Sequence, residues 1–110
     1  MGVRFVQSDK YWTQVRFVLL NEQGKNEEMS FDAQFKRLDR EGVSDLTSSG
    51  KNDSDMLRLV LVGWKLKDLD TKEDIPFTDS TFEEFLKIPG AAGVTMLRFL
   101  DTVGASREKK

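Results

Sequence analysis

Apolar and polar residues alternate in two segments of the N-terminal third of the chain. In residues 12–20 the apolar side chains recur at every second position, at Val15, Phe17 and Leu19. Residues 29–36 repeat this pattern, with apolar residues at Met29, Phe31, Ala33 and Phe35. A period of two predicts two β-strands with one face toward a core. The polar segment between them, residues 21–26, contains a glycine and predicts a hairpin loop. A short extra strand is predicted over residues 4–6.

A two-stranded hairpin is barely stable alone in water, so its apolar face needs a cover, and the rest of the chain predicts helices. Asp39 is the expected N-cap of a short helix over residues 40–46, and Asp53 that of a helix over residues 53–62. The run 59–62 is apolar throughout and fits a buried strand equally well, because periodicity alone does not separate the two. We favour the helix because of its cap and acidic start.

Two more helices are predicted near the C-terminus. Ser80 and Glu83 have the spacing of a capping box, and the helix they begin ends at Pro89. The last helix is predicted over residues 90–103, followed by Gly104 as its C-terminal glycine. The residues expected on its buried face are Met96, Leu97, Leu100 and Val103.

The predicted elements amount to one α+β domain over residues 1–110, with an N-terminal antiparallel β-hairpin or small sheet packed against a C-terminal set of α-helices. A chain of 110 residues fits a single core. We expect residues 12–104 to be ordered and residues 1–3 and 105–110 to be frayed. Residues 65–74 are charged and are expected to be irregular.

Charge and composition narrow the classes of function. The 17 basic and 19 acidic residues are interspersed and give a net charge of −2, whereas a duplex-binding domain normally gathers a basic excess on one face. Nucleic acid is therefore not an expected partner. No apolar run resembles a signal peptide or a membrane span, so we expect a cytoplasmic protein with no membrane partner.

The chain has no cysteine and no histidine, which removes thiolate nucleophiles, imidazole bases and the usual transition-metal ligands. Carboxylates are left, but Glu83 and Glu84 are adjacent on a predicted helix and point about 100° apart. Glu27 and Glu28 are another adjacent pair without supporting spacing. We expect no catalytic residues and no cofactor.

One acidic stretch has part of the spacing of a calcium-binding loop. Its first, third, seventh and twelfth places are Asp68, Asp70, Asp74 and Asp79. The fifth place is Lys72, which would repel a cation, and the sixth is Glu73 where such a loop needs glycine. A structural loop is therefore the preferred interpretation, and no metal site is expected.

The C-terminal half is rich in aromatic residues, namely Trp64, Phe77, Phe82, Phe85 and Phe99. Most of these are expected in the core, because aromatic residues dominate small cores. Trp64 and Phe77 flank a charged stretch, and we predict that they stay exposed as anchors for a protein partner.

Several segments in a fixed order resemble a known family. The segment 31–41 follows the predicted hairpin, and three motifs come after it: Val62-Gly63-Trp64, Ile75-Pro76-Phe77-Thr78 and Leu86-Lys87-Ile88-Pro89-Gly90. Together they resemble the tail assembly chaperones of long-tailed bacteriophages and prophages, over about residues 13–104. The chain departs from that pattern at residues 70–74, where the family leads us to expect a turn containing glycine.

The resemblance implies a non-enzymatic assembly factor that binds the tape measure protein and the major tail tube protein. It implies a location in the cytoplasm of the bacterial host and absence from the mature virion. Whether the chain forms a homo-oligomer stays open. Two other hypotheses are a structural tail or head–tail connector protein of the virion and, from another class, a small carboxylate-dependent hydrolase.

Overall fold

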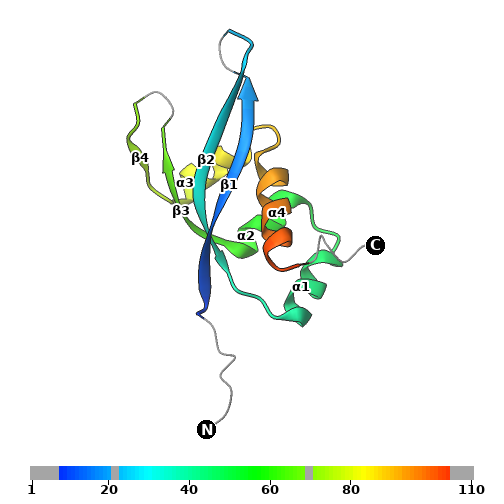
Figure 1. Ribbon diagram of the computed structural model, residues 1–110. Coiled ribbons are helices and arrows are strands. Elements are labelled where there is room, and N and C mark those ends of the chain that lie inside the picture. Colours follow the sequence, from blue (N-terminus) through cyan, green and yellow to red (C-terminus); the bar gives the residue numbers. More distant parts are fainter. Residues whose placement is uncertain (1–7, 21–22, 69–70, 105–110) are drawn as a thin grey trace.

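The described part of the chain folds into a four-stranded sheet and four helices, which confirms the predicted α+β class (Figure 1). The computed structural model describes residues 8–20, 23–68 and 71–104. The elements in chain order are β1 (Lys10–Leu20), β2 (Asn26–Lys36), α1 (Arg40–Thr47), α2 (Asp53–Val60), β3 (Leu61–Lys67), β4 (Asp74–Ile75), α3 (Asp79–Leu86) and α4 (Ala91–Thr102). The predicted strand over residues 4–6 and the predicted frayed ends, 1–3 and 105–110, lie outside the described residues.

The sheet has the strand order β1-β2-β3-β4, and every neighbouring pair is antiparallel. β1 and β2 pair along their whole length, from Lys10 opposite Lys36 to Leu20 opposite Asn26. The predicted hairpin is therefore confirmed, although both strands begin earlier than expected. β2 and β3 pair only between Asp32 and Phe35.

A bulge interrupts the short ladder between β2 and β3. Gln34 lies opposite Gly63, but Phe35 lies opposite Leu61, so Val62 has no counterpart on β2. A bulge of this kind bends a strand and increases its twist. In Figure 1, β3 and β4 consequently diverge from the β1–β2 hairpin above this point.

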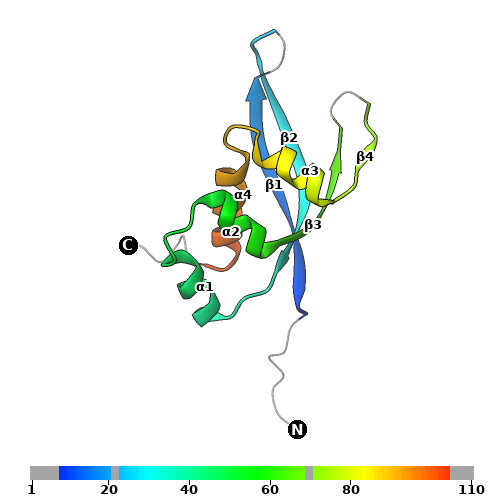
Figure 2. The same ribbon diagram turned by 180° about the vertical axis from the view of Figure 1, so that it is seen from behind.

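Helices α2, α3 and α4 lie on one face of the sheet, and α1 lies to its side, as the two opposite views show (Figures 1 and 2). The inward positions of the hairpin are the predicted ones, with Val15, Ala33 and Phe35 fully buried. Phe35 meets Phe99 of α4 edge to face, with ring centroids 5.1 Å apart. Burying an aromatic side chain of this size contributes ~2–3 kcal/mol, so this contact holds α4 to the sheet.

The segment around residue 60 is partly helix and partly strand, the two alternatives that the sequence analysis left open for residues 59–62. α2 ends at Val60, and its C-cap Leu61 is extended and begins β3. The predicted helix through Val62 is therefore wrong at its end, and the predicted irregular segment is wrong at its start, because β3 continues to Lys67. Because the chain changes from helix to strand at this point, Leu57 is buried on α2 and Leu61 is buried on β3. A uniformly apolar run does not show where such a change occurs.

Two of the expected caps belong to neighbouring residues. Asn52, not Asp53, caps α2, because its Oδ1 accepts a hydrogen bond from the Asp55 amide at 2.8 Å. Thr78 and Thr81, not Ser80 and Glu83, form the capping box of α3. The N-cap Asp39 of α1 is confirmed, since its carboxylate accepts from the Gly42 amide at 2.8 Å.

The buried face of α4 differs from the predicted one at Leu97, which is 63% exposed. Thr95 and Phe99 are fully buried instead, beside the expected Met96. The Thr95 hydroxyl is satisfied within the helix, where it donates to the Ala91 carbonyl at 2.8 Å. Gly104 follows the C-cap with a positive φ of 82°, as expected of the glycine that ends a helix.

Candidate interaction surface

Trp64, one of the two predicted partner anchors, lies in the core. Its side chain is only 7% exposed, and its indole N–H donates to the Ile75 carbonyl at 2.8 Å. The expected exposure of Trp64 is therefore wrong. Its position on β3 points inward because it pairs with Ala33, which also faces the helices.

Phe77, the other predicted anchor, is half-buried and packs against Trp64. The two rings meet edge to face with centroids 4.9 Å apart, and Phe77 also contacts Phe82 at 5.3 Å. Both residues thus belong to an aromatic cluster that joins β3, the segment after β4 and α3. Partner binding by either residue stays a prediction.

Residues of the motifs behind the family resemblance have structural roles in the fold. A Cβ at Gly63 would lie 2.7 Å from the Gln34 side-chain oxygen, so the glycine leaves room for this Gln34 conformation opposite it on β2. Thr78 caps α3. Gly90, with φ at +84°, supplies the left-handed residue that begins α4.

The turn that departs from the family pattern is closed without glycine. The Asp68 amide donates to the Glu73 carbonyl at 2.8 Å, and the Lys72 amide to the Asp68 carbonyl at 2.9 Å. Lys72 takes the positive φ, 65°, that the expected glycine would have taken. The turn is therefore possible, at some cost in backbone strain.

The acidic residues of the proposed calcium loop are used within this hairpin. Asp74 forms a salt bridge with Lys67 at 2.7 Å, and the Asp68 carboxylate accepts from the Thr71 amide at 3.0 Å. Asp70 lies outside the described residues. Within the described part of the chain, no three acidic side chains gather in the way a metal ion would require.

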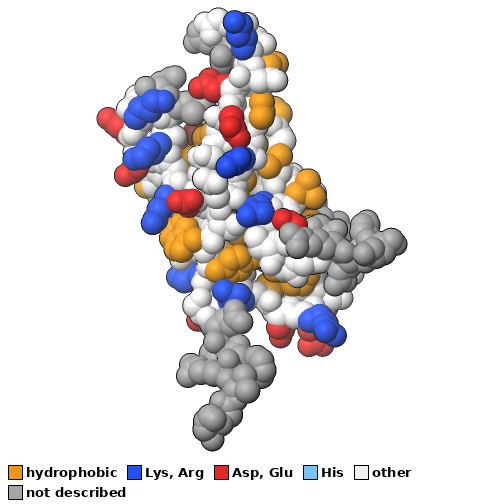
Figure 3. Space-filling model, viewed as in Figure 1, with side chains coloured by type: hydrophobic (Ala, Val, Ile, Leu, Met, Phe, Trp, Pro, Cys, Tyr) orange, Lys and Arg blue, Asp and Glu red, His pale blue; other side chains and the backbone are white. Residues whose placement is uncertain are grey.

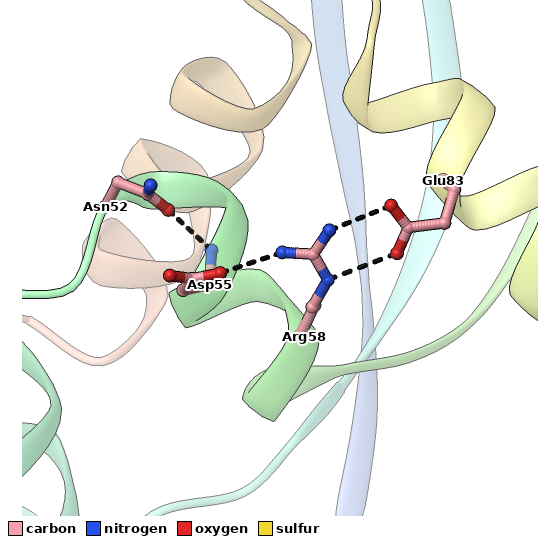
Figure 4. Close-up of polar contacts among 4 residues, drawn as sticks. All are labelled: Asn52, Asp55, Arg58 and Glu83. Atoms are coloured by element: carbon pink, nitrogen blue, oxygen red, sulfur yellow. Dashed lines mark hydrogen bonds and ion pairs between the residues drawn. The ribbon is translucent and has the colours of Figure 1, made fainter.

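Glu83, the carboxylate that we weighed as a catalytic acid, is held by an arginine (Figure 4). Arg58 of α2 donates to both its oxygens, from Nη2 at 2.8 Å and from Nε at 3.1 Å, and also reaches Asp55 at 2.8 Å. The hydrogen bonds from Arg58 lower the pKa of Glu83 below its usual value, against a smaller opposing effect of desolvation. A general acid needs a raised pKa, so this environment favours a structural role.

The face of the sheet opposite the helices carries an apolar patch that we had not predicted as a site. We call this side of the sheet the open face. The patch has two separate parts on β1: Trp12, which is 46% exposed, and the pair Val18 and Leu20, which are 57% and 71% exposed. The two parts lie roughly 20 Å apart along the strand. Figure 3, drawn from this side, shows hydrophobic groups interspersed with charged ones. A sequence signal was present, because these three residues occupy the positions in β1 where the alternation calls for polar side chains.

Charged groups lie beside Trp12 and between the two parts of the apolar patch. Lys65 of β3 places its ammonium 4.8 Å from the centre of the Trp12 ring. Arg16 lies 3.8 Å from Glu28 of β2. An aromatic side chain with a polar rim is the usual composition of a protein-binding surface of modest size.

No described helix is long and apolar enough to cross a membrane. Comparisons of the chain with protein-family models, with curated proteins and with solved structures found no match. The likeness to tail assembly chaperones therefore stays a hypothesis from the sequence motifs, to be judged by experiment.

Proposed function

We propose that this chain is a non-enzymatic tail assembly chaperone of a long-tailed phage or prophage. In this role it binds the tape measure protein and the major tail tube protein in the host cytoplasm and leaves before the virion is complete. The order of the sequence motifs supports the specific role. The open face, with its exposed apolar patch, is the observation that carries the more general proposal of a protein-binding module.

The chemistry of such a role fits a surface of this kind. A long helical tape measure exposes apolar area until the tail tube surrounds it, and a temporary cover would prevent its aggregation. A cover that must leave again needs a small interface with few anchors. Trp12, with the pair Val18 and Leu20 roughly 20 Å further along the same strand, offers such anchors without a large apolar area.

Co-expression with the tape measure protein encoded beside this chain tests the proposal. We expect the two proteins to co-purify and the tape measure to stay dispersed. Trp12→Ser should reduce the recovered complex severalfold, since an exposed aromatic anchor commonly accounts for ~2 kcal/mol or more of binding. Leu97→Ser is the matched control, because Leu97 is also exposed but lies on α4 in the other layer.

Three results would count against this proposal. Failure of the two proteins to co-purify or to protect each other from aggregation would remove the chaperone role. Loss of the complex with Leu97→Ser, but not with Trp12→Ser, would move the binding surface from the sheet to the helices. Detection of the chain in purified virions by mass spectrometry would reassign it as a structural tail or connector protein.

A further inference from the structure

A cleft of about 840 Å³ separates the β1–β2 hairpin from the β3–β4 hairpin. It begins where the β2–β3 ladder stops, at Asp32 opposite Lys65. One wall is β2 from Glu28 to Asp32. The other is β3 from Trp64 to Lys67, together with Asp68, Lys72, Asp74, Ile75 and Pro76. Figures 1 and 2 both show the two hairpins diverging at this level.

The β2 wall of this cleft is an unpaired strand edge. The Gln14 carbonyl accepts a hydrogen bond from Arg98 at 3.0 Å and so points away from β2. Along a strand, the backbone N–H and C=O groups of successive residues point alternately to one side and to the other, so those of Arg16, like those of Gln14, point away from β2. Ser30 lies opposite Arg16, and its N–H and C=O groups therefore point away from β1. By the same alternation, Glu28 and Ser30 direct their N–H and C=O groups into the cleft. None of the described residues provides a partner for these four groups.

Aromatic side chains close the inner side of the cleft. Phe31, Trp64 and Phe85 pack against one another, with ring centroids 5.3–6.4 Å apart. These rings bridge β2 and β3 beneath the sheet where backbone hydrogen bonds are missing. The indole N–H of Trp64 bonds to Ile75 beside β4, which ties β3 away from β2. The packing that forms the core thus holds the cleft open.

The other edge of the same hairpin is partly occupied, at Lys10 and Gln14. On β1, Arg98 occupies the Gln14 carbonyl, and the Ser8 hydroxyl donates to the Lys10 carbonyl at 2.6 Å. Side chains that occupy edge groups are a common defence against unwanted strand pairing. At Arg16 and Val18, opposite Ser30 and Glu28, described residues leave the β1 edge unoccupied as well. The β2 edge differs from it in facing a cleft with β3 as a second wall.

From this geometry we propose that the cleft binds an extended peptide segment of a partner protein, which adds a strand to β2 beside Glu28 and Ser30. The unpaired N–H and C=O groups of Glu28 and Ser30 would form hydrogen bonds only with a peptide in an extended conformation, as in other cases of strand addition. The aromatic inner side favours small apolar side chains at every second position. On the open face the strand would lie between Glu28 of β2 and Lys67 of β3, which favours neutral polar side chains at the alternate positions. This inference does not depend on the tail assembly role.

A synthetic peptide of about six residues matches the unpaired length of β2, since a strand rises ~3.3 Å per residue. We would use a fluorescent, end-blocked peptide of alternating valine and threonine and measure its binding by fluorescence polarisation. N-methylation of single peptide nitrogens should weaken binding only at every second position, because alternate N–H groups of a paired strand face β2. A uniform response along the peptide would overturn the proposal.

Proline substitutions on the protein provide the matched test. Ser30→Pro removes an N–H that points into the cleft and fills that space with its ring. We expect binding to weaken by about tenfold or more, the factor for the loss of one or two ordinary hydrogen bonds. Arg16→Pro is the control, because Arg16 lies directly opposite Ser30 and its N–H points to the other edge of the hairpin.

Thermal unfolding of both proline variants shows whether they keep the fold. Equal loss of peptide binding in the two folded variants would contradict the proposal. If Ser30→Pro unfolds, the N-methyl series on the unmodified protein still decides the question. Analytical ultracentrifugation without peptide tests whether a second copy of this chain occupies the cleft. A dimer that is lost in Ser30→Pro would show that it does, and would overturn the assignment to a peptide of a partner protein.

Discussion

At the scale of the residue, Gly90 is a position where the backbone conformation requires a residue without a side chain. Gly90 has φ at +84°, a conformation that other L-residues rarely adopt. A Cβ placed there would meet no atom within 4 Å, so only the backbone conformation demands glycine. Gly90 of the third motif is therefore explained by the backbone conformation at the entry into α4.

Gly90→Ala should lower the free energy of unfolding by ~1–2 kcal/mol, the usual cost of a left-handed conformation for a residue with a Cβ. Urea denaturation measures this loss. Gly93→Ala, within α4, should instead be neutral or stabilising by up to ~1 kcal/mol, because alanine is the better helix former. A Cβ at Gly93 meets only the Asp53 carboxylate, at 3.3 Å. Equal effects of the two substitutions would contradict this explanation.

At the scale of the element, the ends of the helices depend on which of several neighbouring hydroxyl or carboxyl groups reaches a free amide. Around the start of α3, Thr78, Ser80 and Thr81 all have a suitable side chain. In the fold, Thr81 donates to the Pro76 carbonyl at 2.6 Å and accepts from the Thr78 amide at 2.9 Å. The incoming segment 76–78 therefore selects Thr78 as the cap.

Thr78→Ala should lower the free energy of unfolding by ~1 kcal/mol, a typical cost of removing an N-cap side chain. Ser80→Ala is the matched control two residues later, and we expect a change within ~0.5 kcal/mol, as at most exposed positions. Denaturant midpoints of the two variants, at equal slopes, provide the comparison. A larger loss from Ser80→Ala would restore the capping box expected from the sequence.

At the scale of the whole molecule, α2 and α3 are joined through Arg58 and Glu83, which are 25 positions apart in the sequence. The hydrogen bonds from Arg58 lower the pKa of Glu83 in the folded chain. A lowered carboxylate pKa adds stability above the ordinary pKa, and this stability is lost as the pH falls through the folded value. The ordinary value for this group is 4.5.

Glu83→Gln should therefore destabilise the protein at pH 7, and the difference from the unmodified chain should shrink and vanish as the pH falls well below 4.5. Unfolding in urea at several pH values measures this. Glu84→Gln is the control, since Glu84 is exposed and forms no salt bridge with a described residue. A difference that persists unchanged in acid would show that the ion pair is not its cause.

The sequence by itself determined the elements whose signals are local. The period of two in residues 12–20 and 29–36 predicted the hairpin and its inward residues, because alternate side chains of a strand face opposite sides. The N-cap Asp39 and the helix α4 were also predicted from the sequence. So was the α+β class, because an apolar hairpin face requires helices to cover it.

Tertiary contacts decided the rest. The run at residues 59–62 is uniformly apolar, so only pairing with β2 determined that the helix ends at Val60 and a strand begins. The charged stretch beside Trp64 led to the prediction that this residue is exposed, but its position opposite Ala33 places it on the inward face of the sheet. The apolar patch and the cleft depend on which face the helices cover and where a ladder stops. Such features follow from contacts between segments distant along the chain, which a local pattern does not encode.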